Sequence, residues 1–247
     1  MHGVIALKAT KTNFIPITVL ILCCLAFLLL SYISYNKIDK MASALAGEQN
    51  PTIVIDPGHG GEDGGAGGAS SAALEKDLNL SISLKLQKFL ETAGFRVVMT
   101  RTTDVSIGDK TLDTVRERKV SDIHNRLKIV QAQDDCLLIS VHQNHFTESQ
   151  YSGAQMFYST KNAGSKDLAE NIKSRVVELL QPENKRETKP ATDSIYLLWN
   201  TKIPAVLVEC GFLSNPSEAA KLNDKTYQEQ MAFAICSGIL DYAHSNS

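Results

Sequence analysis

The sequence predicts an α/β fold, in which one domain holds a sheet covered by helices on both faces. Short apolar runs that resemble buried strands alternate with longer segments whose apolar residues recur at helical spacing. The run at 136–141 is apolar on both faces, as strands at the centre of a covered sheet are. About 200 residues follow the N-terminal segment, which is enough for one well-buried domain.

The first elements are expected around a glycine-rich loop. Residues 52–56, Thr-Ile-Val-Ile-Asp, predict a buried strand, and the loop at 58–68 that follows holds seven of the fifteen glycines. Apolar residues at helical spacing predict a helix at 74–93, which Gly94 ends. Residues 95–99 predict a second strand. The polar, irregular segment 100–121 then leads to a short helix, expected at about 122–132.

The rest of the domain continues the alternation of strands and helices. Asn215 and Pro216 indicate a helix start, with Glu218 as the partner in a capping box. The other expected elements are strands at 136–141, 153–158, 195–198 and 205–208, helices at 165–180 and 227–242, and a polar loop at 183–194.

The N-terminal part predicts a membrane segment. Residues 14–35 contain no charged residue and are long enough to cross a bilayer as a helix. We expect a cytoplasmic N-terminus at 1–13, a transmembrane signal anchor at 14–35, a tether at 36–50 and the folded domain at 51–247. A signal peptide that is removed is the alternative, because Ala44-Leu45-Ala46 has the small-x-small form of a cleavage site. Both interpretations place the domain outside the cytoplasm.

Charge and cysteine content narrow the class of protein. The formal net charge is −2, and the part after residue 40 is more acidic, since four of the 25 basic residues but only one of the 27 acidic residues precede it. This balance, without a basic cluster, argues against a nucleic-acid partner. Cys136, Cys210 and Cys236 lie in apolar runs and are expected to be buried free thiols, with a disulfide between two of them as the alternative.

Residue types that bind metals fall at the ends of predicted strands, where open α/β sheets place their sites. His59 follows the first strand, His142 follows the third, Glu209 ends the last, and Glu75 opens the first helix. Two histidines and one carboxylate form the ligand set of a catalytic zinc, and a further carboxylate can transfer protons during hydrolysis. The joint placement of the four residues therefore favours the site of a metal-dependent hydrolase, while spacing alone identifies no metal.

Simpler explanations compete for each residue. A histidine after a strand is often an ordinary loop residue, and Glu75 alone suits the first turn of a helix. His145 is a rival ligand, but on an extended segment it would point away from the side of His142. Other chemistries lack their motifs: the sequence has no HExxH, nucleotide-binding glycine motif or GxSxG. A strand thiol such as Cys210 usually packs in the core and is a weak candidate nucleophile.

Five motifs, in order along residues 52–242, resemble the zinc-dependent N-acetylmuramoyl-L-alanine amidases of the Amidase_3 family. They are IVIDPGHGG at 53–61, LEKDLN at 74–79, VMTR at 98–101, ISVHQN at 139–144 and PAVLVECGFLSN at 204–215. The resemblance implies a mixed, mostly parallel six-stranded sheet flanked by helices. It implies that His59, Glu75 and His142 bind Zn²⁺, and that Glu209 is the catalytic glutamate. Arg101 and Asn144 match motif positions and are expected only to shape the site.

The resemblance also implies a substrate. The family cleaves the amide bond between the lactyl group of N-acetylmuramic acid and L-alanine in peptidoglycan. The N-terminal anchor, the lack of wall-binding repeats and the segment 116–126 are similar to the CwlD-type germination-specific amidases, which take part in forming muramic-δ-lactam in spore cortex. In a sporulating cell this implies a location between the forespore membranes. His145 after Asn144 and the long segment 102–121 depart from the usual pattern of the family.

Two other functions remain open at this level. One is a different zinc hydrolase of cell-wall material, such as a peptidase or a deacetylase. The other is a non-enzymatic wall-binding or regulatory module, although the presence of all four site residues argues against it. An accessory protein that supports the metal site is a further hypothesis, for which the sequence gives no direct sign.

Overall fold

The computed structural model describes residues 28, 31–32, 50–67 and 74–245. The chain divides into two units, Met1–Gln49 and Asn50–Ser247, and the second contains all the elements from β1 to α7. No helix within the described ranges is long and apolar enough to cross a membrane. The expected anchor at 14–35 lies almost entirely outside those ranges and stays a prediction.

A six-stranded sheet forms the centre of the second unit, with the strand order β2-β1-β3-β6-β4-β5. Strands β2, β1, β3 and β6 run parallel to one another, whereas β4 is antiparallel to β6. The strands are β1 (Thr52–Pro57), β2 (Val97–Met99), β3 (Cys136–Asn144), β4 (Gln155–Tyr158), β5 (Lys189–Pro190) and β6 (Ala205–Phe212). The α/β class and the mixed, mostly parallel six-stranded sheet are thus confirmed.

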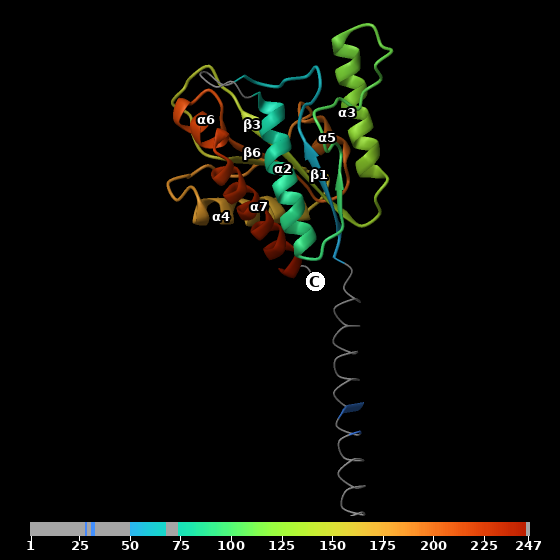
Figure 1. The fold of residues 1–247 in the computed structure, drawn as a ribbon, viewed down its shortest axis with the longest axis vertical. Coiled ribbons are helices and arrows are strands. Elements are labelled where there is room, and N and C mark those ends of the chain that lie inside the picture. The colour runs from blue at the N-terminus through green and yellow to red at the C-terminus, as the bar shows by residue number, and fades with distance from the viewer. Residues whose placement is uncertain (1–27, 29–30, 33–49, 68–73, 246–247) are drawn as a thin grey trace, which may run out of the picture. The chain divides into compact units, whose positions relative to one another are not determined.

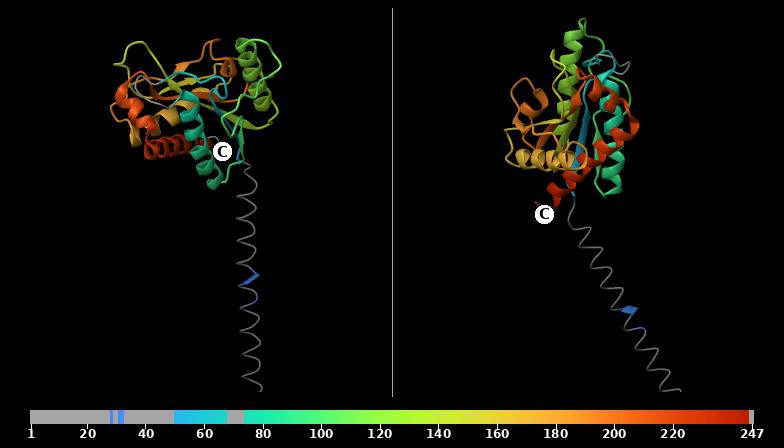
Figure 2. Two further views of the ribbon diagram at one scale, coloured as in Figure 1. Left: turned by 45° about the horizontal axis from the view of Figure 1, so that its top comes forward. Right: turned by 90° about the vertical axis from the view of Figure 1, so that its left-hand side faces the viewer.

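Helices cover both faces of this sheet. On one face, Ile53 and Ile55 of β1 pack into a core shared with α2, α4 and α7, while Val54 faces α3 and α5 on the other side. Figures 1 and 2 show α2 and α7 side by side, away from α3. The helices are α2 (Glu75–Thr92), α3 (Val115–Gln131), α4 (Gly164–Leu179), α5 (Tyr196–Asn200), α6 (Pro216–Asn223) and α7 (Lys225–Ser245).

The number of strands is right, but one expected strand is wrong. Residues 196–198 belong to the short helix α5, and the Trp199 amide donates to the carbonyl of Ile195, the residue before the helix, at 3.0 Å. A run of four apolar residues does not distinguish a strand from a buried helix. Here Leu197 and Leu198 of α5 pack into the core on the same face of the sheet as Val54. In its place the sheet contains β5, a strand of two exposed residues inside the segment 183–194, which was expected to be a loop.

Helix α3 is longer than expected, because it begins at Val115 and not near residue 122. A capping box starts it: the Thr114 hydroxyl accepts from the Glu117 amide, and the Glu117 carboxylate accepts from the Thr114 amide. The Thr-x-x-Glu pattern was therefore present inside the polar segment. Much of the long link between β2 and β3 is thus helix.

The prediction of a capping box at α6 is right for Asn215 and wrong for Glu218. Asn215 caps the helix by accepting from the Ser217 and Glu218 amides. The Glu218 carboxylate turns away and accepts from the amides of Gly153, at 2.9 Å, and Phe212, at 2.8 Å. This buried acid therefore ties α6 to the strand ends of the sheet. The expectation for the thiols of the domain is confirmed, since Cys136, Cys210 and Cys236 are free and buried.

Candidate active site

Parallel strands bring the sequence-predicted residues to one edge of the sheet. His59 lies two residues beyond the end of β1, while His142 and Glu209 lie near the ends of β3 and β6. Glu75 is the first residue of α2, which packs against β1 and β3. The carboxyl ends of these strands meet at the same edge, so all four side chains lie in one region.

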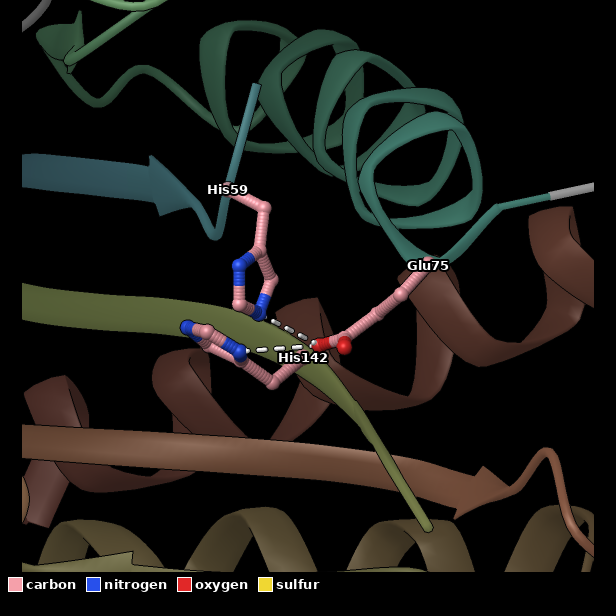
Figure 3. A group of neighbouring side chains, drawn as sticks. All are labelled: His59, Glu75 and His142. Atoms are coloured by element: carbon pink, nitrogen blue, oxygen red, sulfur yellow. Dashed lines mark hydrogen bonds and ion pairs between the residues drawn. The ribbon is translucent and has the colours of Figure 1, made fainter. Parts of the chain in front are cut away.

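Three of these side chains point toward one another, as Figure 3 shows. Glu75 Oε1 lies 3.2 Å from His59 Nε2 and 3.0 Å from His142 Nδ1. One nitrogen or oxygen from each residue lies within 4.8 Å of the others, which is close enough for a shared metal ion. His145 is exposed and is not a member of this group.

The glycine-rich loop allows this close approach. A Cβ atom on Gly58 would lie 2.2 Å from the His142 ring, and one on Gly65 would lie 2.5 Å from Glu75 Oε2. His59 itself has φ of +62°, a left-handed conformation that is costly for a residue with a side chain. The loop therefore uses small residues next to the site and holds its histidine in a strained backbone conformation.

Without a metal, the negative charge of Glu75 is balanced by the positive charge of the neighbouring histidine His59. Burial works against the ionised form of Glu75, but hydrogen bonds with His142 and His59 lower the pKa of this carboxyl. Burial also works against charge on His59, yet hydrogen bonds with Asp63 and Glu75 raise its pKa to about 9. A divalent ion would take over the role of these protons, since histidine binds metals in its neutral form. Two imidazoles and a carboxylate suit zinc.

Glu209 lies beside His142 on the neighbouring strand. Its Oε2 is buried and accepts no hydrogen bond from the described residues. Burial, opposed by His142 and helped by the negative charge of Glu75, raises the pKa of this carboxyl to about 7. A carboxyl with a pKa near neutrality can both take up and release a proton under physiological conditions.

Glu209 also lines a cavity of about 340 Å³. The floor of the cavity includes His59 and His142, and its walls come from α3 and α5. Ile123 and Tyr196 contribute apolar surface to these walls. A substrate in this cavity would therefore contact His59, His142 and the Glu209 carboxylate together.

Two buried arginines fix the backbone that carries His59. Arg126 donates to the carbonyls of Pro57, at 2.7 Å, and His59, at 2.6 Å. Arg101 donates to the carbonyls of Pro57 and Gly58, both at 2.9 Å. Arg101 was expected to shape the site, whereas Arg126 was not assigned a role. A buried arginine on a mostly polar helix leaves no periodic signal, so sequence reasoning had little means of finding it.

Asp63 is a second residue that sequence reasoning missed. Its Oδ2 lies 2.8 Å from His59 Nδ1, so it contacts the side of the ring that faces away from Glu75. Histidines that bind metals usually carry such a hydrogen bond on their other nitrogen. An acid four residues after a candidate histidine was the available signal. Cys210, by contrast, is fully buried in the core on the other face of the sheet, where burial raises the pKa of its thiol.

Comparisons with known proteins identify the family of this chain. Residues 53–241 match the Amidase_3 family model, described as N-acetylmuramoyl-L-alanine amidase. The germination-specific N-acetylmuramoyl-L-alanine amidase of Bacillus subtilis (strain 168) is 38% identical over 190 residues, which are 77% of this chain and 78% of the relative.

Solved structures give the same result. The CwlD amidase from Clostridioides difficile, solved in complex with the GerS lipoprotein, is similar with a TM-score of 0.77 and 41% identity, over 79% of this chain and all of that chain. The N-acetylmuramoyl-L-alanine amidase AmiC2 of Nostoc punctiforme is similar with a TM-score of 0.66 and 29% identity, over 79% of this chain and 98% of that chain.

Proposed function

Because this chain belongs to the Amidase_3 family of N-acetylmuramoyl-L-alanine amidases, we propose that it cleaves the amide between the lactyl group of N-acetylmuramic acid and L-alanine with the help of a zinc ion. The observation that carries the proposal is the convergence of His59, Glu75 and His142 beside an acid in a cavity. In this proposal these three residues bind the ion and leave a position open for the substrate or water.

Glu209 is the proposed catalytic residue. A zinc ion held by His59, Glu75 and His142 would supply Lewis-acid chemistry for the scissile carbonyl and for the attacking water. The ionised Glu209 carboxylate takes the proton of the attacking water and gives it to the leaving amine of L-alanine. Burial raises the pKa of this carboxyl to about 7 without a metal, and a bound divalent ion would lower it, which favours the ionised form that takes the proton of water. Ile123 of α3 and Tyr196, Leu197 and Leu198 of α5 add apolar surface to a cavity that Lys119, Asp122 and Arg126 also line.

Product analysis tests the reaction. The full-length protein, loaded with zinc, is incubated with purified peptidoglycan, and the products are analysed by mass spectrometry. We expect free stem peptides that begin with L-alanine, together with glycan from which whole peptides are missing. Peptides cut internally would point to a peptidase, and loss of acetyl groups to a deacetylase. A protein that binds the wall material without changing it would support a non-enzymatic module.

We further propose a role in spore germination. The relative in Bacillus subtilis is named a germination-specific amidase, and the match covers most of both chains. An amidase of this kind acts outside the cytoplasm. Within a sporulating cell we place it between the forespore membranes, held there by the segment at 14–35 or released after cleavage. Deletion of the gene should leave a cortex that lacks muramic-δ-lactam, which muropeptide analysis detects.

A lipoprotein partner is part of the same proposal. The similar CwlD amidase was solved in complex with the GerS lipoprotein. We therefore propose that this amidase also associates with an exported lipoprotein of the same cell. Affinity purification of the tagged amidase from sporulating cells, followed by mass spectrometry, should recover such a protein. Recovery of the amidase alone at every stage of sporulation would contradict the proposal.

A further inference from the structure

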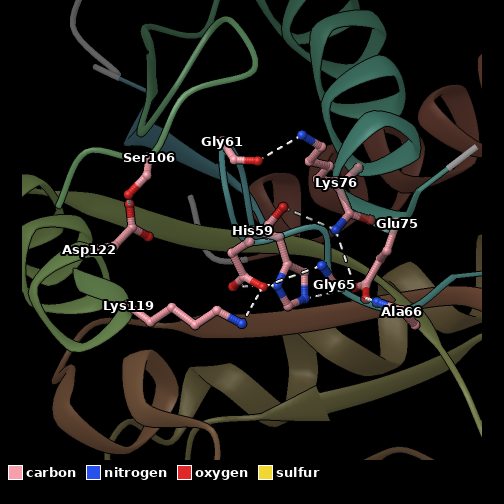
Figure 4. A network of polar contacts seen from close by, with 12 residues as sticks. His59, Gly61, Gly65, Ala66, Glu75, Lys76, Ser106, Lys119 and Asp122 are labelled. Carbon is pink, nitrogen blue, oxygen red and sulfur yellow. Dashed lines mark hydrogen bonds and ion pairs between the residues drawn. The ribbon is translucent and has the colours of Figure 1, made fainter. Parts of the chain in front are cut away.

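Helix α3 is connected to the side chain of His59 through the Asp63 carboxylate, in addition to the bond from Arg126 to the His59 carbonyl. Asp63 Oδ2 lies 2.8 Å from His59 Nδ1, and Asp63 Oδ1 lies 2.7 Å from Lys119 Nζ. Figure 4 shows the Lys119 side chain reaching from α3 toward this group. The neighbouring residues make a parallel contact, because Arg118 donates to both oxygens of Glu62, at 2.7 and 2.8 Å. The first half of α3 thus holds the loop at two adjacent residues.

The loop itself is closed around Asp63. The amide of Gly60 donates to the Asp63 carbonyl at 2.9 Å, and the amide of Asp63 donates back to the Gly60 carbonyl at 3.2 Å. Gly65 adds a longer contact, from its amide to Asp63 Oδ1 at 3.3 Å. These bonds fix the Asp63 backbone, but they leave its side chain to be oriented mainly by Lys119 and by the His59 ring.

This orientation matters because His59 has two ring nitrogens and only one faces the cluster. Nε2 lies toward Glu75, and Nδ1 lies toward Asp63. A carboxylate on the far nitrogen sets the tautomer and the angle of a histidine that binds a metal. Displacement of Asp63 would free the ring to rotate away from Glu75. Lys119 therefore affects, through Asp63, the orientation of His59 Nε2, the nitrogen that would bind the ion.

We propose that Lys119 is a positioning residue for the metal centre, which raises zinc affinity by holding Asp63 against His59. This inference rests on the proposed zinc site. Lys119 is half exposed, and an exposed ion pair adds little to the stability of a fold. The pair should therefore matter more for metal binding than for folding. The zinc affinity of the site would then depend on the position of α3.

The test measures zinc affinity of the full-length protein by competition with a chromogenic chelator. Asp63→Asn should weaken binding about 10–100-fold, the usual effect of removing an outer partner of a ligand. Lys119→Met should weaken it by a smaller factor, and Lys119→Arg should restore most of the loss. Because Lys119 acts through Asp63, the double variant should bind no more weakly than Asp63→Asn alone. Lys128→Met, in the last turn of α3, is the matched control and should bind as the wild type does.

Two further measurements separate positioning from a general loss of structure. The absorption bands of the cobalt(II)-loaded protein should change in Lys119→Met, because the His59 ring has moved, and should be unchanged in Lys128→Met. The melting temperature of metal-free Lys119→Met should equal that of the metal-free wild type.

The outcomes distinguish this inference from the zinc site on which it rests. A wild-type protein that binds no divalent ion would overturn the site itself. Tight binding by the wild type, with equal affinity and an identical cobalt spectrum in Lys119→Met, would overturn only the role of Lys119. Additive losses in the double variant, or a lower melting temperature that accounts for the weaker binding, would also overturn it.

Discussion

His142 of β3 and Glu209 of β6 are register partners on adjacent parallel strands. Such partners lie about 4.8 Å apart and point to the same face of the sheet. The proposed ligand and the proposed base are therefore fixed relative to each other by the strand ladder and not by loops. Ser140 and Leu207, one alternation earlier on the same face, also line the cavity, so its floor is a rigid sheet surface.

Glu209→Gln should abolish turnover and keep zinc. Glutamine has nearly the shape of glutamate but cannot take a proton from water, so the turnover number should fall about 10²–10⁴-fold. Release of stem peptide measures activity, and elemental analysis measures zinc. Glu183→Gln, at an exposed acid outside this cavity, should leave both unchanged. Activity equal to the wild type in Glu209→Gln would end its assignment as the base.

His59→Ala should lose zinc stoichiometrically, because it removes one of the three proposed ligands. The measurement is elemental analysis after dialysis against a buffer with a weak chelator. His145→Ala is the control for the rival ligand, and its exposed position outside the cluster predicts full zinc content. Undiminished zinc in His59→Ala, or loss of zinc in His145→Ala, would contradict the proposed ligand set.

The core of the site could be predicted from sequence because it follows topology. His59, His142 and Glu209 each come near the end of a strand in the parallel part of the sheet, where side chains meet at one edge. Glu75 was found because it opens the helix that follows the same loop. Strand and helix periodicity gave most elements, but a run of four apolar residues at 195–198 had no period long enough to identify a helix.

The supporting contacts could not be predicted from local patterns. Arg126 contacts Asp56 across 70 residues of sequence, and Lys119 meets Asp63 through the packing of α3 against the loop. Both depend on how distant segments pack, and neither residue differs in its neighbourhood from an ordinary charged residue of a helix surface. The two-residue strand β5 is exposed and forms through pairing with β4, so it too lacks a local signal.

Gly58→Ala should disrupt the metal site more than the fold. The new methyl group would lie 2.2 Å from the His142 ring, so the ring must leave the position in which its Nδ1 contacts Glu75. Zinc affinity, measured by chelator competition, should fall at least about tenfold, a change of about 1.4 kcal/mol in binding free energy. Gly67→Ala is a matched control in the same loop, because a Cβ there meets no atom within 4 Å. Equal zinc affinity in both variants would mean that the His142 ring is free to shift without loss of the site.

Asp56→Asn should destabilise the domain at neutral pH and much less in acid. Asp56 is buried and accepts from Arg126 Nη1 at 2.7 Å, Thr100 Oγ1 at 2.7 Å and Ser140 Oγ at 2.8 Å. Asparagine keeps the size but leaves the Arg126 charge with less compensation. Removal of one partner from a buried ion pair costs about 3–5 kcal/mol in the free energy of unfolding.

The pH dependence follows from the direction of the Asp56 pKa. Burial works against ionisation, but Arg126 and the hydrogen bond from Thr100 lower the pKa of this carboxyl below its ordinary value. Its contribution to stability is therefore complete above about pH 4, near the pKa of an unfolded aspartate, and is lost as the pH falls through the lower value in the folded protein. Urea unfolding of the wild type and of Asp56→Asn at pH 7 and at pH 3 should give a difference that narrows in acid. Asp193→Asn, at an exposed position, is the control, and its free energy of unfolding should equal that of the wild type at both pH values. A loss of stability in Asp56→Asn that is the same at both pH values would show that the charge of Asp56 does not stabilise the loop that carries His59.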